Sequence, residues 1–268
     1  MILIGERINA GFKDIGQAIR THDPEPIRRW AREQTVCGAD YLDLNIGAVS
    51  KNPADMAWLV EVVQETVPTP ICVDSNHPEV LRAGLEAADG RPVIVNSTTA
   101  EDEKLEKILP LAVKYNAAII GVAQDEQGSP QNVERRVELG AKIFMAAMEA
   151  GLTPDRIFLD PVLMPLRFMQ DQALKVLEAI REYRILSDPP PHISVGLSNI
   201  CSQTKERSLI ARTFLVMAMA AGLDAAICNV LDPELRAAVA TAELILNREI
   251  YSDDYLRVWS LKRVKGGA

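Results

Sequence analysis

The chain has 268 residues, of which 48% are hydrophobic and 25% charged, and its formal net charge is -8. This length and composition are those of an ordinary globular protein whose core needs no disulfide or structural metal. The negative charge argues against non-specific binding to nucleic acid or to an anionic membrane surface. No apolar run approaches membrane-spanning length, and MILIGERINAG lacks the pattern of a signal peptide, so we expect a cytoplasmic protein.

Apolar segments and helical patterns alternate along the chain. Residues 1–8, MILIGERI, predict a strand ending near Glu6 and Arg7, followed by a loop up to residue 23. Asp23 and Pro24 suit the N-cap and first position of a helix over 24–37. Further strands are expected at 40–47, 70–75, 92–97, 117–123, 156–162, 192–198 and 224–230. Further helices are expected at 52–66, 78–88, 101–115, 132–150, 172–186, 207–221 and 233–247.

Eight strands alternating with eight helical patterns predict an α/β fold, a single (β/α)8 or TIM barrel, with residues 1–268 as one domain. A doubly wound sheet is the alternative, but no GxGxxG sequence follows the first strand. Residues 262–268 are basic and end in two glycines and an alanine, so we expect them to fray.

The cysteines and histidines do not predict a metal site. The four cysteines include no CxxC pair, and the three histidines are scattered. We expect Cys72 in the core, His22 in solvent just before the helix over 24–37, and His192 at the start of a strand, away from the chemistry. Cys201 follows Asn199 closely and is a candidate to line a site.

Most predicted strands have polar residues at or just after their carboxyl ends. These residues are Glu6, Arg7, Asn9, Asp43, Asn45, Asp74, Asn76, Asn96, Ser97, Gln124, Asp160, Ser198, Asn199 and Asn229. Side chains at the carboxyl ends of barrel strands build the active site. A set rich in Asp and Asn, without a Lys, His or Cys base, suits a neutral heterocycle with several N–H donors and suits a phosphate poorly.

Each of these residues also has a purely structural interpretation. Asp43 and Asn45 could cap the next helix or bind loop backbone, and Asp74 could belong to an N-cap region. Asp160 precedes Pro161, where an aspartate often organises a turn, and Arg7 could simply pair with a nearby carboxylate such as Glu6. Several such residues at successive strand ends together favour a polar-ligand site.

Short motifs over nearly the whole chain carry a family resemblance. They are IGERIN (4–9), DLNIG (43–47), CVDS (72–75), NST (96–98), DPVL (160–163), GLSN (196–199) and the segment around Arg207 and Thr213-Phe214-Leu215. With these motifs the chain resembles the pterin-binding methyltransferases that move a methyl group between methyltetrahydrofolate and a corrinoid protein.

The resemblance implies roles for individual residues. Asp74, Asn96 and Asp160 would hydrogen-bond the pterin ring, and Asn199 would approach the ring nitrogen that bears the methyl group. Further candidates for contact with the folate are Ser198, Gln203, Arg207, Asp43 and Asn45. The resemblance also implies a homodimer and a cobalamin-type corrinoid carried by a separate partner protein, because the barrel uses nearly all of this chain.

The mechanism expected from this resemblance is methyl transfer between 5-methyltetrahydrofolate and corrinoid cobalt, in either direction. None of the candidate side chains normally titrates near neutrality. We therefore expect Asn199 to supply a hydrogen bond that strengthens in the transition state, with the proton coming from solvent. Asp74 and Asp160 would mainly hold the pterin in line.

Three alternatives stay open on the sequence. A dihydropteroate synthase-like enzyme shares the fold and ligand, but residues 228–233, CNVLDP, lack that family's Ser-x-Arg pair for pyrophosphate. The first strand also lacks the synthase's Asn-x-Thr-x-Asp-Ser-Phe loop. The others are a barrel that binds pterin without turnover and a pterin-independent barrel enzyme.

Overall fold

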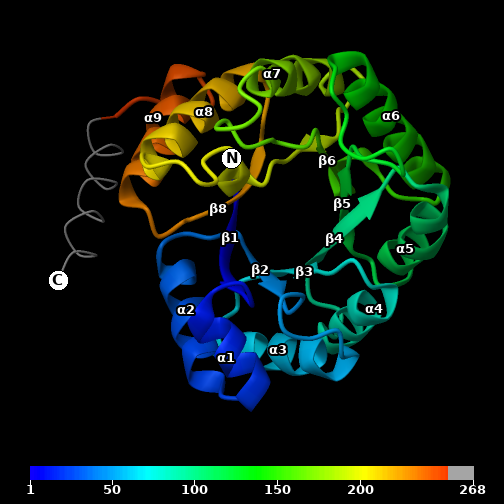
Figure 1. Ribbon diagram of the computed structural model, residues 1–268, viewed down its shortest axis with the longest axis vertical. Helices are drawn as coiled ribbons and strands as arrows, with labels where there is room; N and C mark the ends of the chain where they lie inside the picture. Colours follow the sequence, from blue (N-terminus) through cyan, green and yellow to red (C-terminus); the bar gives the residue numbers. More distant parts are fainter. Residues whose placement is uncertain (253–268) are drawn as a thin grey trace.

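The structure is a computed structural model that describes residues 1–252, so the fraying expected at 262–268 lies outside the described residues. Its strands form a ring with the helices outside it (Figure 1). The strands are β1 (Ile2–Asn9), β2 (Tyr41–Asn45), β3 (Ile71–Asp74), β4 (Val93–Thr99), β5 (Ala118–Val122), β6 (Ile157–Asp160), β7 (His192–Ile193) and β8 (Ala225–Cys228).

The strands pair in parallel in the order β7-β6-β5-β4-β3-β2-β1-β8. The two ends of this order, β7 and β8, meet through the segment just after β7. There Gly196 bridges to Ile227, and the Ile227 amide donates to the Val195 carbonyl over 2.9 Å. These contacts bring the sheet round to a nearly closed barrel. The predicted TIM barrel is therefore confirmed.

The helices cover the outside of the ring. They are α1 (Lys13–Thr21), α2 (Pro24–Val36), α3 (Pro53–Thr66), α4 (Pro78–Ala87), α5 (Asp102–Lys114), α6 (Val133–Glu149), α7 (Gln172–Tyr183), α8 (Arg207–Ala221) and α9 (Pro233–Ile245). Asp23 caps α2 as predicted, because its side chain accepts from the Glu25 amide. Among the described residues, no helix combines the length and the apolar character needed to cross a membrane.

Two expected elements were wrong. The loop expected before residue 24 contains α1, which buries Ile15, Ala18 and Ile19 and is tied to β1 by the ion pair between Asp14 and Arg7. The strand expected over 192–198 pairs with β6 only at His192–Ile193. Farther on, the Gly196 amide donates to the side chain of Asp160, and the chain turns into the short 3-10 helix η2 (Leu197–Asn199).

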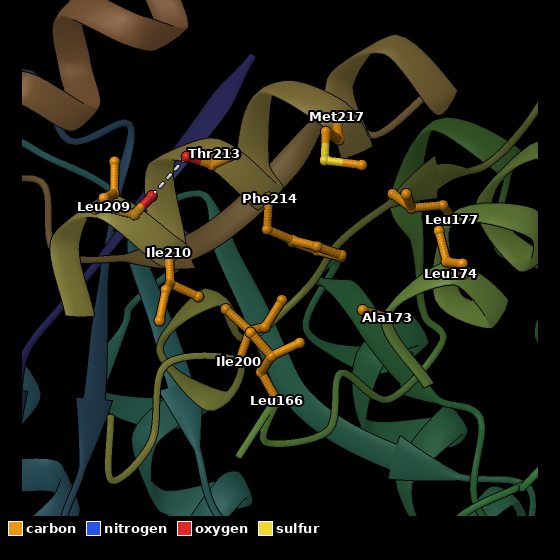
Figure 2. Close-up of a pocket in the computed structure, with 10 residues that line it drawn as sticks. All are labelled: Leu166, Ala173, Leu174, Leu177, Ile200, Leu209, Ile210, Thr213, Phe214 and Met217. Carbon is orange, nitrogen blue, oxygen red and sulfur yellow. Dashed lines mark hydrogen bonds between the residues drawn. The ribbon is translucent and has the colours of Figure 1, made fainter. Parts of the chain in front are cut away.

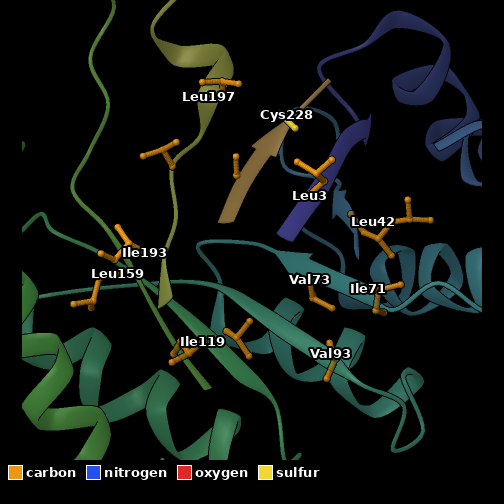
Figure 3. Close-up of a cluster of buried hydrophobic side chains, with 14 of the residues drawn as sticks. Leu3, Leu42, Ile71, Val73, Val93, Ile119, Leu159, Ile193, Leu197 and Cys228 are labelled. Carbon is orange, nitrogen blue, oxygen red and sulfur yellow. The ribbon is translucent and has the colours of Figure 1, made fainter. Parts of the chain in front are cut away.

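Alternate residues of each strand face opposite sides of the barrel wall. One set packs against the helices and includes Leu3, Leu42, Val73, Val93, Ile119 and Leu159 (Figure 3). The other set fills the interior of the barrel with Ile4, Cys72, Ile94, Ile120, Phe158 and Ala225. Cys72 is thus a core residue, as expected. His192 lies at the opening of β7, stacked on Phe158, also as expected.

Candidate active site at the mouth of the barrel

A polar layer lies directly above the apolar interior layer. In a strand, side chains two residues apart lie on the same face. The polar residues that follow the interior apolar residues by two positions therefore also face the inside of the barrel, at its mouth. The pairs are Ile4 and Glu6, Cys72 and Asp74, Ile94 and Asn96, and Phe158 and Asp160.

Asn45, Asp74 and Asn96 are successive partners in the register of β2, β3 and β4. The Asn45 amide nitrogen donates to Oδ2 of Asp74 over 2.5 Å, and Oδ1 of Asn45 accepts from the Gly47 amide over 2.7 Å. Asn45 thus both binds loop backbone, as its structural interpretation predicted, and supports Asp74. Among the described residues, Oδ1 of Asp74 accepts no hydrogen bond, which leaves it available to a ligand.

A second pair lies deeper. The Asn96 amide nitrogen donates to Oδ1 of the buried Asp43 over 3.1 Å. Burial, and then the charge of nearby Asp74, raise the pKa of Asp43 well above its usual range. Burial also raises the pKa of Asp74 to about 6, against the opposing hydrogen bond from Asn45.

Asp160 connects the end of β6 to the turn after β7. Its Oδ1 accepts from the Val162 amide over 2.8 Å, and its Oδ2 accepts from the Gly196 amide over 3.3 Å. The first bond is the turn-organising contact expected for an aspartate before Pro161. Burial raises the pKa of Asp160 to about 6, while these two backbone hydrogen bonds lower it.

Glu6 and Ser198 form a third polar pair. The Ser198 hydroxyl donates to Oε1 of Glu6 over 2.7 Å. Both line a cavity of about 160 Å³ that also contacts Cys201 and Arg207. Arg7 does not pair with Glu6: its guanidinium lies between the Phe12 and Trp30 rings and binds both carboxylate oxygens of Asp14. Arg7 thus pairs with a nearby carboxylate, as its structural interpretation predicted, but the partner is Asp14 of α1 and not Glu6.

Asn199 and Gln203 are exposed residues of the segment that follows β7. Within the described residues, neither side chain forms a hydrogen bond. The Gln203 carbonyl accepts from Arg167 over 2.8 Å, so the structure ties Gln203 to the loop after β6 and not to the strand-end residues. Arg207 is exposed at the first position of α8, beside Glu6.

Comparison with known proteins shows the family to which the chain belongs. Residues 5–229 match the sequence profile described as pterin binding enzyme. The chain belongs to this pterin binding enzyme family. It is 32% identical over 255 residues to the methylcorrinoid:tetrahydrofolate methyltransferase of Eubacterium limosum, covering 93% of this chain and 92% of that protein.

Two further matches are more limited: the first covers only part of a much longer protein, and the second shows likeness of fold alone. The methionine synthase of Mycobacterium leprae is 32% identical over 243 residues, covering 85% of this chain but 20% of that much longer protein. A solved dihydropteroate synthase from Coxiella burnetii, in complex with pteroic acid, superposes with a TM-score of 0.68 at 15% identity. It covers 92% of this chain and 94% of its own, and it shows the shared barrel fold of the pterin binding enzyme family.

In this pterin binding enzyme, sequence reasoning missed residues at the mouth. Lys51 and His77 line a cavity of about 430 Å³ together with Asn45 and Asp74. Both follow their strands by several residues, so the strand-end pattern did not include them. Their one available signal was position in the loops after β2 and β3, which build the mouth of a barrel. Among the described residues, no cluster of His, Cys, Asp and Glu is arranged to hold a metal ion.

An apolar groove lies between α7 and α8. Figure 2 shows its lining, which comes from the two helices and from Leu166 and Ile200. The groove has a volume of about 260 Å³. Leu174 is 62% exposed, Leu209 49% and Met217 47%, which is unusual for large apolar side chains gathered on one surface.

Proposed function

We propose that this chain catalyses methyl transfer between 5-methyltetrahydrofolate and the cobalt of a corrinoid carried by a separate protein. The observation that carries the proposal is the layer of acceptor side chains above the apolar interior of the barrel. The proposal is also supported by the identity to a methylcorrinoid:tetrahydrofolate methyltransferase over nearly the full length of both proteins. The direction of transfer is left open.

The strand-end residues suit the binding of a pterin. Asp74, Asn96 and Asp160 would accept hydrogen bonds from the ring N–H and amino groups, because each keeps acceptor capacity toward the mouth. Asp43 and Asn45 would contribute through their hydrogen bonds to Asn96 and Asp74. Further along the folate, the contacts would come from Ser198, Gln203 and Arg207.

Asn199 is the proposed catalytic residue. The ring nitrogen must take up a proton or hydrogen bond as its bond to the methyl carbon breaks, since a tertiary amine is a poor leaving group. The Asn199 amide is exposed at the rim and has no hydrogen-bond partner among residues 1–252. It would donate a hydrogen bond that strengthens as charge develops on that nitrogen, and water would supply the proton. The reduced cobalt of the partner protein supplies the nucleophile.

The test mixes the purified protein anaerobically with methyltetrahydrofolate and reduced cobalamin and follows the cobalt absorption spectrum. We expect conversion to methylcobalamin, slowed at least a hundredfold in Asn199→Ala with folate affinity little changed. Asn116→Gly is the control, because Asn116 lies before β5 on the opposite end of the barrel and its φ of 52° suits glycine. Folate binding without conversion, with free or protein-bound corrinoid, would leave a non-catalytic pterin binder.

Two surfaces of the chain are candidates for contact with partner proteins. We propose that the corrinoid protein docks over the mouth and that residues 1–268 act as one pterin-binding barrel domain.

We also propose that the chain forms a homodimer. The groove between α7 and α8 exposes Leu174 and Met217, which a second copy would cover. Sedimentation should give a dimer for the native chain and a monomer for Leu174→Glu; a native monomer would contradict it.

A further inference from the structure

Glu6 is a half-buried carboxylate at the mouth that the proposed chemistry does not use. Glu6 lies on β1, the strand beside β8, while Asn199 follows β7 almost two hundred residues later in the chain. Its hydrogen bond from Ser198 joins these distant segments, and Ser198 is the neighbour of Asn199 in the η2 turn.

A bulge in β1 explains why Glu6 can reach Ser198. In the pairing of β1 with β2, Gly5 lies opposite Leu42 and Ile8 lies opposite Leu44, so Glu6 and Arg7 together face the single residue Asp43. An extra residue in one strand of a pair bends it and re-aims its side chains. Here Glu6 is directed at the η2 turn, and Arg7 is directed at Asp14.

Gln34 of α2 holds this bulge in place. The Arg7 backbone amide donates to Oε1 of the fully buried Gln34 over 2.9 Å, in place of a bond to the neighbouring strand. Gly5 makes room for the glutamine side chain, because a Cβ on it would lie 2.4 Å from that same oxygen. The direction of Glu6 is therefore set by packing beneath the strand.

The η2 turn needs support from outside itself. A single 3-10 turn has poor internal hydrogen bonds, and here the Ile200 amide reaches the Leu197 carbonyl over 3.3 Å. Two other contacts are weak: the Gly196 amide reaches Asp160 over a long 3.3 Å, and the Cys201 thiol, a poor donor, reaches the Ser198 carbonyl over 3.4 Å. The bond from Ser198 to Glu6, at 2.7 Å to a carboxylate, is the shortest of the side-chain contacts to the turn.

Burial and the neighbouring groups act on the pKa of Glu6 in opposite directions, and burial has the larger effect. Burial raises its pKa, while the Ser198 hydrogen bond and the nearby Arg207 guanidinium lower it. Arg207 and Asn229 also line the cavity beside Glu6.

We propose that Glu6 is a positioning residue: the bulge in β1 aims its carboxylate at the Ser198 hydroxyl, and that hydrogen bond holds the turn that carries Asn199. This proposal rests on the role given to Asn199 above. It assigns Ser198 a structural hydrogen bond to Glu6 in addition to any contact with the folate.

The test is a mutant cycle of Glu6→Ala, Ser198→Ala and the double variant, with Glu6→Gln as the conservative replacement. We expect each single substitution to lower kcat about tenfold and the double to lower it no further, because both remove the same bond. Folate Kd should change less than threefold in Glu6→Ala, and Glu6→Gln, which keeps an acceptor for Ser198, should retain most of kcat. The matched control is Ser208→Ala, which removes a serine–carboxylate bond to Asp232 at the same cavity without touching the turn.

Amide hydrogen exchange of residues 197–202 provides a readout that does not depend on turnover. We expect exchange there to speed up in Ser198→Ala and to stay near native in Glu6→Gln and Ser208→Ala. Unchanged exchange in Ser198→Ala, multiplicative losses in the double variant, or equal losses in kcat and folate affinity would each overturn the proposal. A native protein that transfers no methyl group would count against the proposed function, while the exchange result would still decide the role of Glu6. If Glu6→Ala fails to fold, Ser198→Ala and Glu6→Gln carry the same test.

Discussion

The side-chain amide of Asn96 donates a hydrogen bond to the carboxylate of Asp43 over 3.1 Å, joining β4 to β2 across the intervening β3. Both side chains are buried. An amide whose nitrogen is engaged in this way keeps its carbonyl oxygen as an acceptor for another donor. The pair therefore determines which way round the Asn96 amide lies at the mouth of the barrel.

Replacing Asp43 should weaken folate binding through Asn96. We expect Asp43→Ala to raise the folate Kd about tenfold, the usual effect of losing one buried hydrogen-bond partner. Asp43→Asn should stay within about threefold, since burial already favours an uncharged group there and the new amide oxygen can still accept from Asn96. Calorimetric titration with tetrahydrofolate measures both values, and equal losses in the two variants would contradict the assignment.

Asp160 should make the ligand-free protein less stable as pH rises. Its folded pKa of about 6 exceeds the usual aspartate value, so the folded chain binds this proton more tightly than the unfolded chain. The protonated carboxyl is therefore accommodated below about pH 4, and the cost of ionisation builds up as pH rises through about 6. Each pKa unit corresponds to about 1.4 kcal/mol, so the effect of this one group approaches about 3 kcal/mol.

Asp160→Asn isolates this effect from other titrating groups. Urea denaturation between pH 4.5 and 7.5 should show the native chain losing free energy of unfolding relative to the variant as pH rises. A constant difference across this range would mean that Asp160 titrates at an ordinary pKa.

Val162 should reverse the usual ranking of alanine and glycine. Its φ of 65° lies in the left-handed region, which a β-branched residue rarely adopts, and its amide donates to Asp160. At ordinary positions glycine is less stable than alanine by about 0.5–1 kcal/mol. We expect Val162→Gly to unfold at equal or higher urea concentration than Val162→Ala, and the opposite order would show that the backbone is unstrained.

Arg136 should stabilise the segment that follows Asp160. This fully buried residue of α6 donates through Nε to the Pro161 carbonyl over 2.8 Å and through Nη2 to Oε1 of Gln172 over 2.9 Å. We expect Arg136→Lys to cost about 2–4 kcal/mol of unfolding free energy, because an ammonium cannot reach both acceptors and leaves the others unpaired. Folate affinity should fall as well, through the displaced Asp160.

The matched comparison for Arg136 is Arg135→Lys on the neighbouring, half-buried position. Arg135 pairs with the buried Asp125 and the exposed Glu138, and a lysine keeps the positive charge beside both. Its replacement should therefore change stability by less than about 1 kcal/mol. Equal losses at the two positions would mean that the hydrogen bonds of Arg136 contribute little.

Much of the barrel follows from local chemistry. Asp23 with Pro24 and Asp232 with Pro233 begin helices where the sequence predicts them, because a short side chain caps amides within its own turn. The missed helix α1 has no such cap: no side-chain hydrogen bond is made at its N-cap, Phe12. It is stabilised by Arg7 and by burial of Ile15, contacts that a local pattern does not contain.

The sequence by itself determined the alternation of strands and helices and the rule that polar residues end the strands, since both depend on the period of side chains along each element. It therefore predicted Asp74, Asn96 and Asp160 together at one end of the barrel. Only the tertiary structure decided their partners: Asp43 beneath Asn96, Asn45 beside Asp74, and Glu6 against Ser198. Hydrogen bonds between strands depend on register, bulges and burial, which arise when distant segments pack and which no single segment encodes.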